Sequence, residues 1–346
     1  MHPKRIFLFC LLLSLISLPV TSHAAIKVGS SCVKIGSVTT ISKVKFVCLQ
    51  LKNSPSWQPA TPENMHRLAL EKSVTQQTLP SALQEKLLQA RGDKSRWLDQ
   101  TCSVDFASID TPVCEGGDLN SKRLIVLYGD SHASMWMSAI ESIAQKQGYK
   151  VRLFAKLACP IIREPIWSYQ LNKPFIECTQ WQEKVIEEIE MLKPDVLIIT
   201  DQWKPIVIDG KRSDYDTPFA WQREFPKALQ ELSATTKKLI VIGNNPSLSQ
   251  DPVSCISKPR SSLPLCASGR TQADNANINN IEKKAAIAIK AAYIDTVSWA
   301  CTQSLCPVVI AGKIAYFDQW HFSESFVQYL RPLLEKALGL PAQMSD

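Results

Sequence analysis

The chain has 346 residues, of which 45% are hydrophobic and 21% are charged, and its formal net charge is +7. This hydrophobic content is that of an ordinary globular protein, and the length suffices for one large domain or two small ones. The charges are dispersed, without a basic stripe interleaved with aromatic residues, so the composition gives no support to nucleic-acid binding. A mild preference for anionic surfaces of the cell envelope is the most that this charge implies.

Residues 1–24 have the pattern of a secretory signal peptide. Two basic residues precede an apolar run, and Ser22-His23-Ala24 offers small residues at the positions that direct cleavage. The apolar run has about 15 residues, which is short for a membrane span of about 20, so cleavage before Ala25 is favoured over an uncleaved anchor. Loss of this segment lowers the net charge to +5. We therefore expect a protein that is secreted or resides in the cell envelope, soluble once the signal peptide is removed.

The cysteines agree with an oxidising compartment. Cleavage removes Cys10 and leaves ten cysteines, an even number. The simplest prediction pairs neighbours in sequence: Cys32 with Cys48, Cys102 with Cys114, Cys159 with Cys178, Cys255 with Cys266, and Cys301 with Cys306. A metal site is the alternative, but the sequence has no CxxC pair and only three histidines after cleavage. We predict disulfides and no metal.

Residues 25–58 alternate between apolar and polar residues in the manner of β-strands, as in VTTISKVKFVCLQL. A segment this short cannot own a large core, so the Cys32 and Cys48 pair would have to staple it, with Trp57 closing the hairpin. The segment resembles the small C…G…C…W hairpins of secreted bacterial proteins. Either wall attachment or packing would account for such a β-hairpin module.

Residues 59–120 are polar and partly helical. Leu83, Leu87 and Leu88 have helical spacing, and Pro80 and Gly92 interrupt the pattern. We predict that this segment is a helical connector.

The pattern changes in residues 121–346, where short apolar runs alternate with amphipathic stretches of helix length. The runs are LIVLY (124–128), VRLFA (151–155), DVLIIT (195–200), LIVIG (239–243) and AAYIDT (291–296). Such alternation is typical of an α/β domain, here with a parallel five-stranded sheet and helices on both faces. Functional sites in these sheets lie at the carboxyl ends of the strands.

Gly129-Asp130-Ser131-His132 directly follows the first predicted strand, and a helix is predicted to begin there. Ser131 would stand at a strand-to-helix turn, where it could act as a nucleophile if a base lay within hydrogen-bond reach. The alternative is structural, because Asp130 or Ser131 could simply be the N-cap of the helix. His132 is a candidate for lining the pocket or for bonding to a loop.

A candidate base lies near the C-terminus, where Asp318 and His321 are three residues apart. On a turn or a first helical turn this spacing lets the two side chains share a face. The carboxylate could then hold one imidazole nitrogen while the other faces Ser131. A cap or a surface pair is the structural alternative.

The two motifs together resemble the SGNH/GDSL hydrolase superfamily. Ala158-Cys159-Pro160 after the second strand and Gln202-Trp203 after the third resemble the branch whose SGNH domains are associated with membrane O-acyltransferases of cell-surface glycans. The resemblance covers about residues 121–340. It implies a flavodoxin-like, three-layer α/β/α sandwich and a triad with Ser131 as nucleophile, His321 as general base and acid, and Asp318 as its orienting carboxylate.

The sequence departs from the family pattern at the oxyanion hole. Typical members have a glycine after the second strand and an asparagine after the third. Ala158 stands near the glycine position, where its backbone N–H could serve. Gln202, the indole of Trp203, or Asn244 and Asn245 after the fourth strand could replace the missing asparagine. Loss of one such donor costs about 10²–10³ in rate, so the sequence is compatible with a weak or a specialised enzyme.

The resemblance implies a serine esterase or O-acyltransferase that acts on acyl groups, with acetyl the first expectation, of an envelope polysaccharide or of peptidoglycan. An acyl-serine intermediate would form without metal or organic cofactor. The partner would be an acylated or acceptor glycan, and transfer would require a separate membrane acyltransferase or a soluble donor.

Two hypotheses from other classes stand beside the enzyme. The missing asparagine favours a non-catalytic glycan-binding envelope protein that retains the fold, whereas the presence of Ser131, Asp318 and His321 argues against it. A purely structural envelope protein anchored by the 25–58 module is the third hypothesis.

Overall fold

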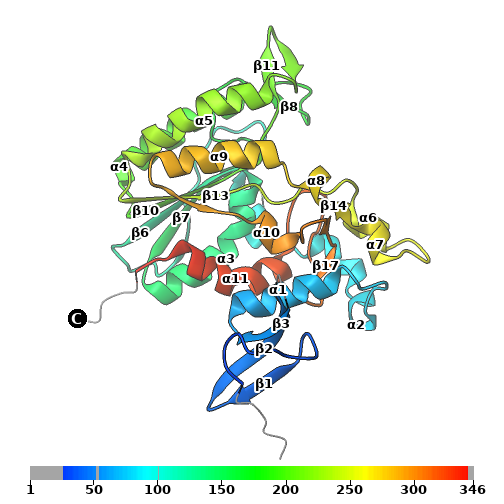
Figure 1. Ribbon diagram of the computed structural model, residues 1–346. Coiled ribbons are helices and arrows are strands. Elements are labelled where there is room, and N and C mark those ends of the chain that lie inside the picture. Colours follow the sequence, from blue (N-terminus) through cyan, green and yellow to red (C-terminus); the bar gives the residue numbers. More distant parts are fainter. Residues whose placement is uncertain (1–25, 52–53, 100, 342–346) are drawn as a thin grey trace, which may run out of the picture. The chain divides into compact units, whose positions relative to one another are not determined.

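The computed structural model describes residues 26–51, 54–99 and 101–341, which fall into two compact units divided after Ala60 (Figure 1). The predicted signal peptide, residues 1–24, and its cleavage site lie outside the described residues. None of the helices in the described ranges has both the length and the apolar character that a membrane span needs. The division after Ala60 lies close to the boundary expected between the N-terminal module and the rest of the chain.

The first unit is a small antiparallel sheet of β1 (Val38–Ile41), β2 (Val44–Gln50) and β3 (Pro55–Pro59). Cys48 in β2 forms a disulfide with Cys32 and lies opposite Trp57 of β3. The third strand, to which Trp57 belongs, extends the two-stranded hairpin expected from the sequence. Residues 46–49 are its buried centre.

The second unit is built on a sheet whose strand order is β15-β13-β10-β6-β7-β4. The five strands expected from the apolar runs are all present and parallel: β6 (Leu124–Gly129), β7 (Lys150–Lys156), β10 (Val196–Thr200), β13 (Lys238–Ile242) and β15 (Ala292–Ile294). Because β6 lies between β7 and β10, the order reverses beside β6, as in flavodoxin-like folds. The α/β fold class predicted from the sequence is confirmed.

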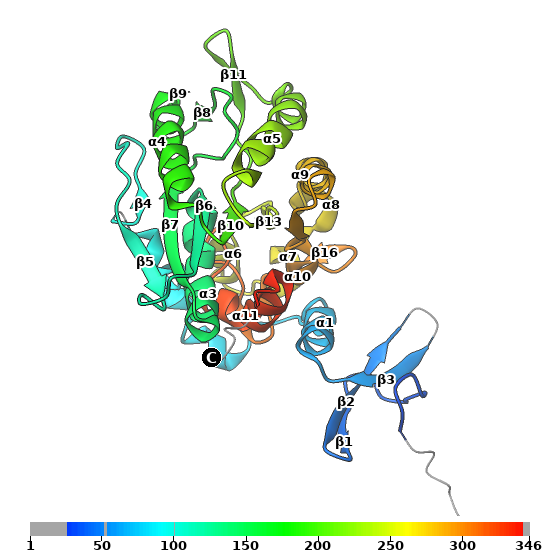
Figure 2. The ribbon, with the colours of Figure 1, turned by 90° about the vertical axis from the view of Figure 1, so that its left-hand side faces the viewer.

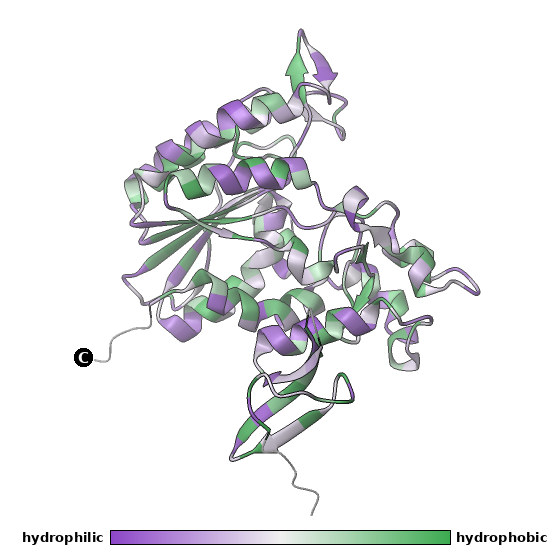
Figure 3. Cartoon of the chain, in the orientation of Figure 1, coloured by the Kyte–Doolittle hydropathy of each residue, from purple (hydrophilic) through white to green (hydrophobic). Residues whose placement is uncertain are grey.

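Helices cover both faces of this sheet (Figures 1 and 2). One face carries α3 (Ser131–Gln147) and α11 (Glu324–Leu338), which pack on Ile125, Leu127 and other inward residues of the strands. The opposite face carries α4 (Ile176–Leu192), α5 (Thr217–Ser233) and α9 (Ala276–Ala288), which pack on Val126, Tyr128 and their neighbours. Successive strand residues alternate between the two cores, so both faces of the sheet are mainly apolar and the strands are rich in hydrophobic residues (Figure 3). The charged residues of β7 are Lys150, Arg152 and Lys156.

Of the predicted connector 59–120, residues 61–120 belong to the second unit and form more than a helical connector, whereas residues 59–60 belong to the first unit. Residues 61–120 contain α1 (Pro62–Ser73), α2 (Ser81–Gln84), η1 (Leu87–Gly92) and η2 (Arg96–Leu98), followed by β4 (Ser103–Val104) and β5 (Cys114–Gly117). Both strands pair with β7, β4 in parallel and β5 antiparallel, and the Cys102–Cys114 disulfide joins their ends. The sheet therefore has seven strands rather than the five expected, because this segment adds β4 and β5 at the side of β7.

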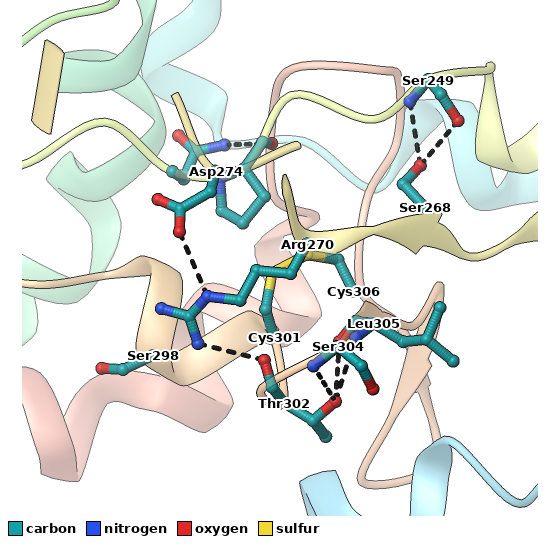
Figure 4. Close-up of a disulfide and its surroundings, with 12 residues drawn as sticks. Ser249, Ser268, Arg270, Asp274, Ser298, Cys301, Thr302, Ser304, Leu305 and Cys306 are labelled. Atoms are coloured by element: carbon teal, nitrogen blue, oxygen red, sulfur yellow. Dashed lines mark hydrogen bonds and ion pairs between the residues drawn. A yellow bond between two sulfur atoms is a disulfide. The ribbon is translucent and has the colours of Figure 1, made fainter. Parts of the chain in front are cut away.

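Short elements fill the connections at the carboxyl edge and beyond it. They are β8 (Trp167–Ser168), β9 (Lys173–Pro174), β11 (Ile206–Ile208), β12 (Lys211–Ser213), α6 (Pro252–Ile256), α7 (Leu263–Cys266), β14 (Ser268–Gly269), α8 (Arg270–Ala273), α10 (Val297–Ala300), β16 (Leu305–Cys306), β17 (Val309–Ile310) and β18 (Lys313–Ile314). The disulfides Cys159–Cys178, Cys255–Cys266 and Cys301–Cys306 brace these connections. Figure 4 shows the last of them beside Arg270, which donates to the Asp274 carboxylate and to the Thr302 carbonyl.

Candidate active site

Ser131 is the first residue of α3 and stands at the carboxyl edge of the sheet, directly after β6. The turn is tight because Gly129 packs against the carbonyl of Thr200 in β10, where any β-carbon would collide. Asp130 then caps the helix, and its Oδ1 accepts the His132 N–H at 2.8 Å. The N-cap expected as a structural alternative is therefore Asp130, which leaves the Ser131 side chain free of a capping role.

Asp318 and His321 lie on a closed turn just before α11. The turn is fastened by the Phe317 N–H, which donates to the His321 carbonyl at 3.2 Å. Asp318 Oδ1 accepts the backbone N–H groups of Trp320 at 2.8 Å and of His321 at 2.7 Å. These two bonds satisfy the donors of the turn and fix the carboxylate next to the imidazole.

The structure brings Ser131, His321 and Asp318 together across 190 residues of sequence. The Ser131 Oγ is 2.8 Å from His321 Nε2, and His321 Nδ1 is 2.8 Å from Asp318 Oδ2. The two latter side chains are 14% and 23% exposed, so solvent reaches the group from one side only. The ring of Phe317 stacks on His321 with 5.3 Å between centroids. This is the arrangement of a hydroxyl, a base and an orienting acceptor that nucleophilic catalysis requires.

The electrostatics keep His321 neutral and Asp318 ionised. Burial lowers the pKa of His321 more than the bond to Asp318 raises it. Burial acts to raise the pKa of Asp318, but its bonds to His321 and to the turn outweigh this effect and the pKa falls. A neutral His321 whose Nδ1–H donates to the carboxylate presents the lone pair of Nε2 to the Ser131 hydroxyl.

Ala158 follows the carboxyl end of β7, the strand that pairs with β6. Its φ is +57°, a left-handed conformation that glycine adopts at lower energy. Among the residues that the structure describes, the N–H groups of Ala158 and Ser131 have no hydrogen-bond acceptor. Both N–H groups are therefore available to a ligand at this edge of the sheet.

Gln202, which follows β10, is held by hydrogen bonds from both its backbone and its side chain. Its backbone N–H donates to Asp130 Oδ2 at 3.1 Å, which ties the end of β10 to the start of α3. Its side-chain amide donates to Ser247 at 2.8 Å and accepts from Lys204 at 3.1 Å. The side chain is buried and held by these contacts.

Trp203 and Asn244 were expected as alternative oxyanion donors, and their contacts do not support this. The indole N–H of Trp203 donates to Asn275 at 3.1 Å, and the Trp203 backbone N–H donates to Asn244 at 3.1 Å. Asn244 in turn donates to the buried carboxyl of Glu282 at 2.8 Å. These groups connect the ends of β10 and β13 to α9, because buried polar groups need partners.

His132 is 1% exposed, so it does not line an open pocket. Its ring bonds to Asp130 and to the backbone carbonyl of Trp320, which is the loop contact considered as the alternative from the sequence. Asn245, the neighbour of Asn244 after the fourth strand, donates to the same carbonyl at 2.6 Å. Its side-chain amide therefore holds the turn that carries His321.

Comparison with known proteins places the chain among related sequences and folds. The family model described as SGNH domain (fused to AT3 domains) matches residues 99–336. No curated protein matches the chain. The solved periplasmic domain of a lipopolysaccharide acetyltransferase from Salmonella ser. Paratyphi A is 16% identical, with 64% of this chain and 85% of that chain covered and a TM-score of 0.50. This likeness concerns the fold alone.

Two further solved structures superpose on this chain with lower TM-scores. An acetyl xylan esterase variant from Geobacillus stearothermophilus is 16% identical, covers 66% of this chain and 100% of its own, and gives a TM-score of 0.37. A lipase/acylhydrolase from Enterococcus faecalis is 13% identical, covers 64% and 100%, and gives a TM-score of 0.37.

Proposed function

Because the chain belongs to the SGNH domain family and is thus an SGNH-type hydrolase or O-acyltransferase, we propose that Ser131 is its nucleophile. The substrates proposed are acyl groups, acetyl first among them, on a polysaccharide or peptidoglycan of the cell envelope. The observation that carries this proposal is the continuous path from the Ser131 hydroxyl through His321 to Asp318, with 2.8 Å at each step.

In the first half of the reaction, the Ser131 Oγ attacks the carbonyl carbon of the ester while His321 Nε2 takes the hydroxyl proton. The resulting imidazolium is held by Asp318, which keeps its charge. When the tetrahedral intermediate collapses, the bond from carbon to the leaving alkoxide breaks and His321 returns the proton to that oxygen. An acyl ester on Ser131 and a free alcohol result.

In the second half, an incoming hydroxyl gives its proton to His321 and attacks the acyl carbon. Water yields a free carboxylic acid, whereas a sugar hydroxyl yields a new ester, and both restore the Ser131 hydroxyl. The same residues thus serve hydrolysis and transfer. Transfer requires an acyl donor, for which we propose a separate membrane acyltransferase or a soluble ester.

We propose that the backbone N–H groups of Ser131 and Ala158 stabilise the oxyanion of the tetrahedral intermediate. Both lack an acceptor among the described residues, and both follow neighbouring parallel strands at their carboxyl ends. A pair of donors fixed in advance is what such an intermediate needs. The five disulfides support the proposed location in the cell envelope or outside the cell, where such bonds persist.

Labelling with a fluorophosphonate probe tests the nucleophile. We expect an adduct on the peptide that contains Ser131, formed by the oxidised mature protein and lost in His321→Ala. A folded protein without an adduct, in an assay where a known serine esterase is labelled, contradicts the proposal and favours the glycan-binding alternative. A chromogenic acetyl ester, offered with and without an oligosaccharide acceptor, then separates hydrolysis from transfer by the products formed.

A further inference from the structure

His132 follows the proposed nucleophile and is almost wholly enclosed, with its side chain 2% exposed. Its Nδ1 lies 3.0 Å from Asp130 Oδ1, and its Nε2 lies 3.1 Å from the carbonyl oxygen of Trp320. Trp320 lies in the turn between Asp318 and His321. The ring therefore connects the start of the nucleophile helix to the turn that carries the proposed base.

The two partners of His132 determine where its protons are. A backbone carbonyl can only accept, so Nε2 must carry a hydrogen. Asp130 already accepts the His132 N–H on Oδ1 at 2.8 Å and the Gln202 N–H on Oδ2 at 3.1 Å, which is the role of an ionised carboxylate. Nδ1 must then carry a hydrogen as well. A ring that donates from both nitrogens is an imidazolium.

The ionised state of Asp130 agrees with a His132 ring that carries two hydrogens. Burial of Asp130 acts to raise its pKa, but the neighbouring charge of His132 and the hydrogen bonds outweigh burial, so the pKa lies below its ordinary value. The pair is a buried cation and anion that neutralise each other, which a closed site requires.

The cation lies against the proposed base. The rings of His132 and His321 stack with 4.7 Å between centroids and 27° between planes. A positive charge at this distance disfavours a second one on His321, and this effect of His132 is opposed by the negative charges of Asp318 and Asp130. Two further titratable groups, Asp201 and Lys204, follow β10 and face the pair. Burial raises the pKa of Asp201 to about 7 and lowers the pKa of Lys204, which favours the neutral form of both groups.

We propose that His132 is a positioning residue, an imidazole that donates from both ring nitrogens, holds the Asp318–His321 turn and, by its positive charge, disfavours protonation of the neighbouring base. This inference rests on the proposed function. It assigns to the histidine of the Gly-Asp-Ser-His motif a role toward the base rather than toward the substrate.

The pH dependence of fluorophosphonate labelling in His132→Gln tests the inference. Glutamine keeps a hydrogen-bond donor but has no charge, and Asp130 is left without its cation. Both changes favour protonation of His321. We therefore expect the acid limb of the labelling profile, the pH range in which protonation of His321 lowers the labelling rate, to move up by about one pH unit. The matched control is His66→Gln, because His66 is also buried but bonds to Tyr329, and its acid limb should coincide with that of the wild type.

An acid limb of His132→Gln within about 0.2 pH units of the wild type, on a folded protein, would overturn the inference and leave His132 a structural residue. A wild-type protein that fails to label would instead count against the proposed function. If the variant does not fold, ¹⁵N spectra of the histidines in the wild-type protein decide. We expect hydrogens on both ring nitrogens of His132 at neutral pH, and a neutral tautomer would refute the charge.

Discussion

Asp318→Asn separates the two roles of this carboxylate. The asparagine oxygen can take the place of Oδ1 and keep the bonds from the Trp320 and His321 backbone N–H groups, now 2.8 and 2.7 Å. The amide nitrogen then replaces Oδ2, which lies 2.8 Å from His321 Nδ1. That nitrogen donates and takes the shorter of the two contacts to Nδ1, the other being 3.0 Å from Oδ1. We therefore expect Nδ1 to accept and the ring proton to move to Nε2. Nε2 would then direct a hydrogen at Ser131 and could no longer take its proton.

This change of tautomer lowers the rate of a serine triad by about 10⁴, which corresponds to about 5 kcal/mol of transition-state stabilisation. We expect a loss of that order in the second-order rate of fluorophosphonate labelling, with the melting temperature within about 3 °C of the wild type. Asp318→Ala is the comparison, because it also leaves two N–H groups of the turn without an acceptor. It should be as inactive and less stable by about 1–3 kcal/mol.

Labelling of Asp318→Asn within tenfold of the wild type would refute the reasoning. It would show that the imidazole reaches the correct tautomer without the carboxylate, and that the contact between Asp318 and His321 serves the turn alone. A variant that loses both activity and its thermal transition would instead show that asparagine does not preserve the turn, which the melting temperature reports directly.

Three further outcomes are expected. Burial lowers the pKa of His321, so labelling should be complete at neutral pH and fall only as the pH drops through a midpoint below about 6.5; a midpoint above 7 would contradict this. Burial raises the pKa of Asp201 to about 7, so the folded state binds the extra proton and loses stability as the pH rises from about 4 to 7. Asp201→Asn should therefore melt at least about 2 °C above the wild type near pH 8, with a gain that shrinks toward pH 4; an equal gain at both would argue against a titrating Asp201. Gly129→Ala should lower the free energy of unfolding by about 3 kcal/mol or more in denaturant titrations, because its β-carbon would meet the Thr200 carbonyl, and a neutral effect would disprove this close approach.

The parallel strands were predictable because each is buried on both faces. Residues such as those of β6 and β10 are apolar in succession, and the stretches between them have the length of helices. The two edge strands were not predictable. β4 has only two residues, Ser103 and Val104, and β5 reads Cys-Glu-Gly-Gly, so neither has the run of β-branched or aromatic residues that indicates a strand. Their pairing with β7 and the disulfide between their ends hold them in the sheet.

The candidate triad could be located from the sequence because its motifs are short and local. Asp130 and Ser131 lie at a strand-to-helix boundary, and Asp318 and His321 lie on one turn. What brings the two motifs within 2.8 Å is the packing of α3 and α11 on the same face of the sheet, which no local pattern contains. The hydrogen-bond partners of the other polar residues at this edge could not be predicted either, because they come from distant parts of the sequence.

The polar groups at the carboxyl edge of the sheet are of two kinds. Some bond to other residues and hold the fold, and others have no partner among the described residues and are available to a ligand. The side chains of Gln202, Trp203 and Asn244 bond to other residues of the edge, as buried polar groups must. The donors left without acceptors among the described residues are the backbone N–H groups of Ser131 and Ala158. Backbone donors are fixed by the course of the chain, so their positions do not depend on which side chain is present. The left-handed conformation of Ala158 occurs where the resemblance leads us to expect a glycine, and its N–H is one of these two fixed donors. If the proposed oxyanion hole is correct, these backbone donors replace the asparagine side chain that the sequence lacks.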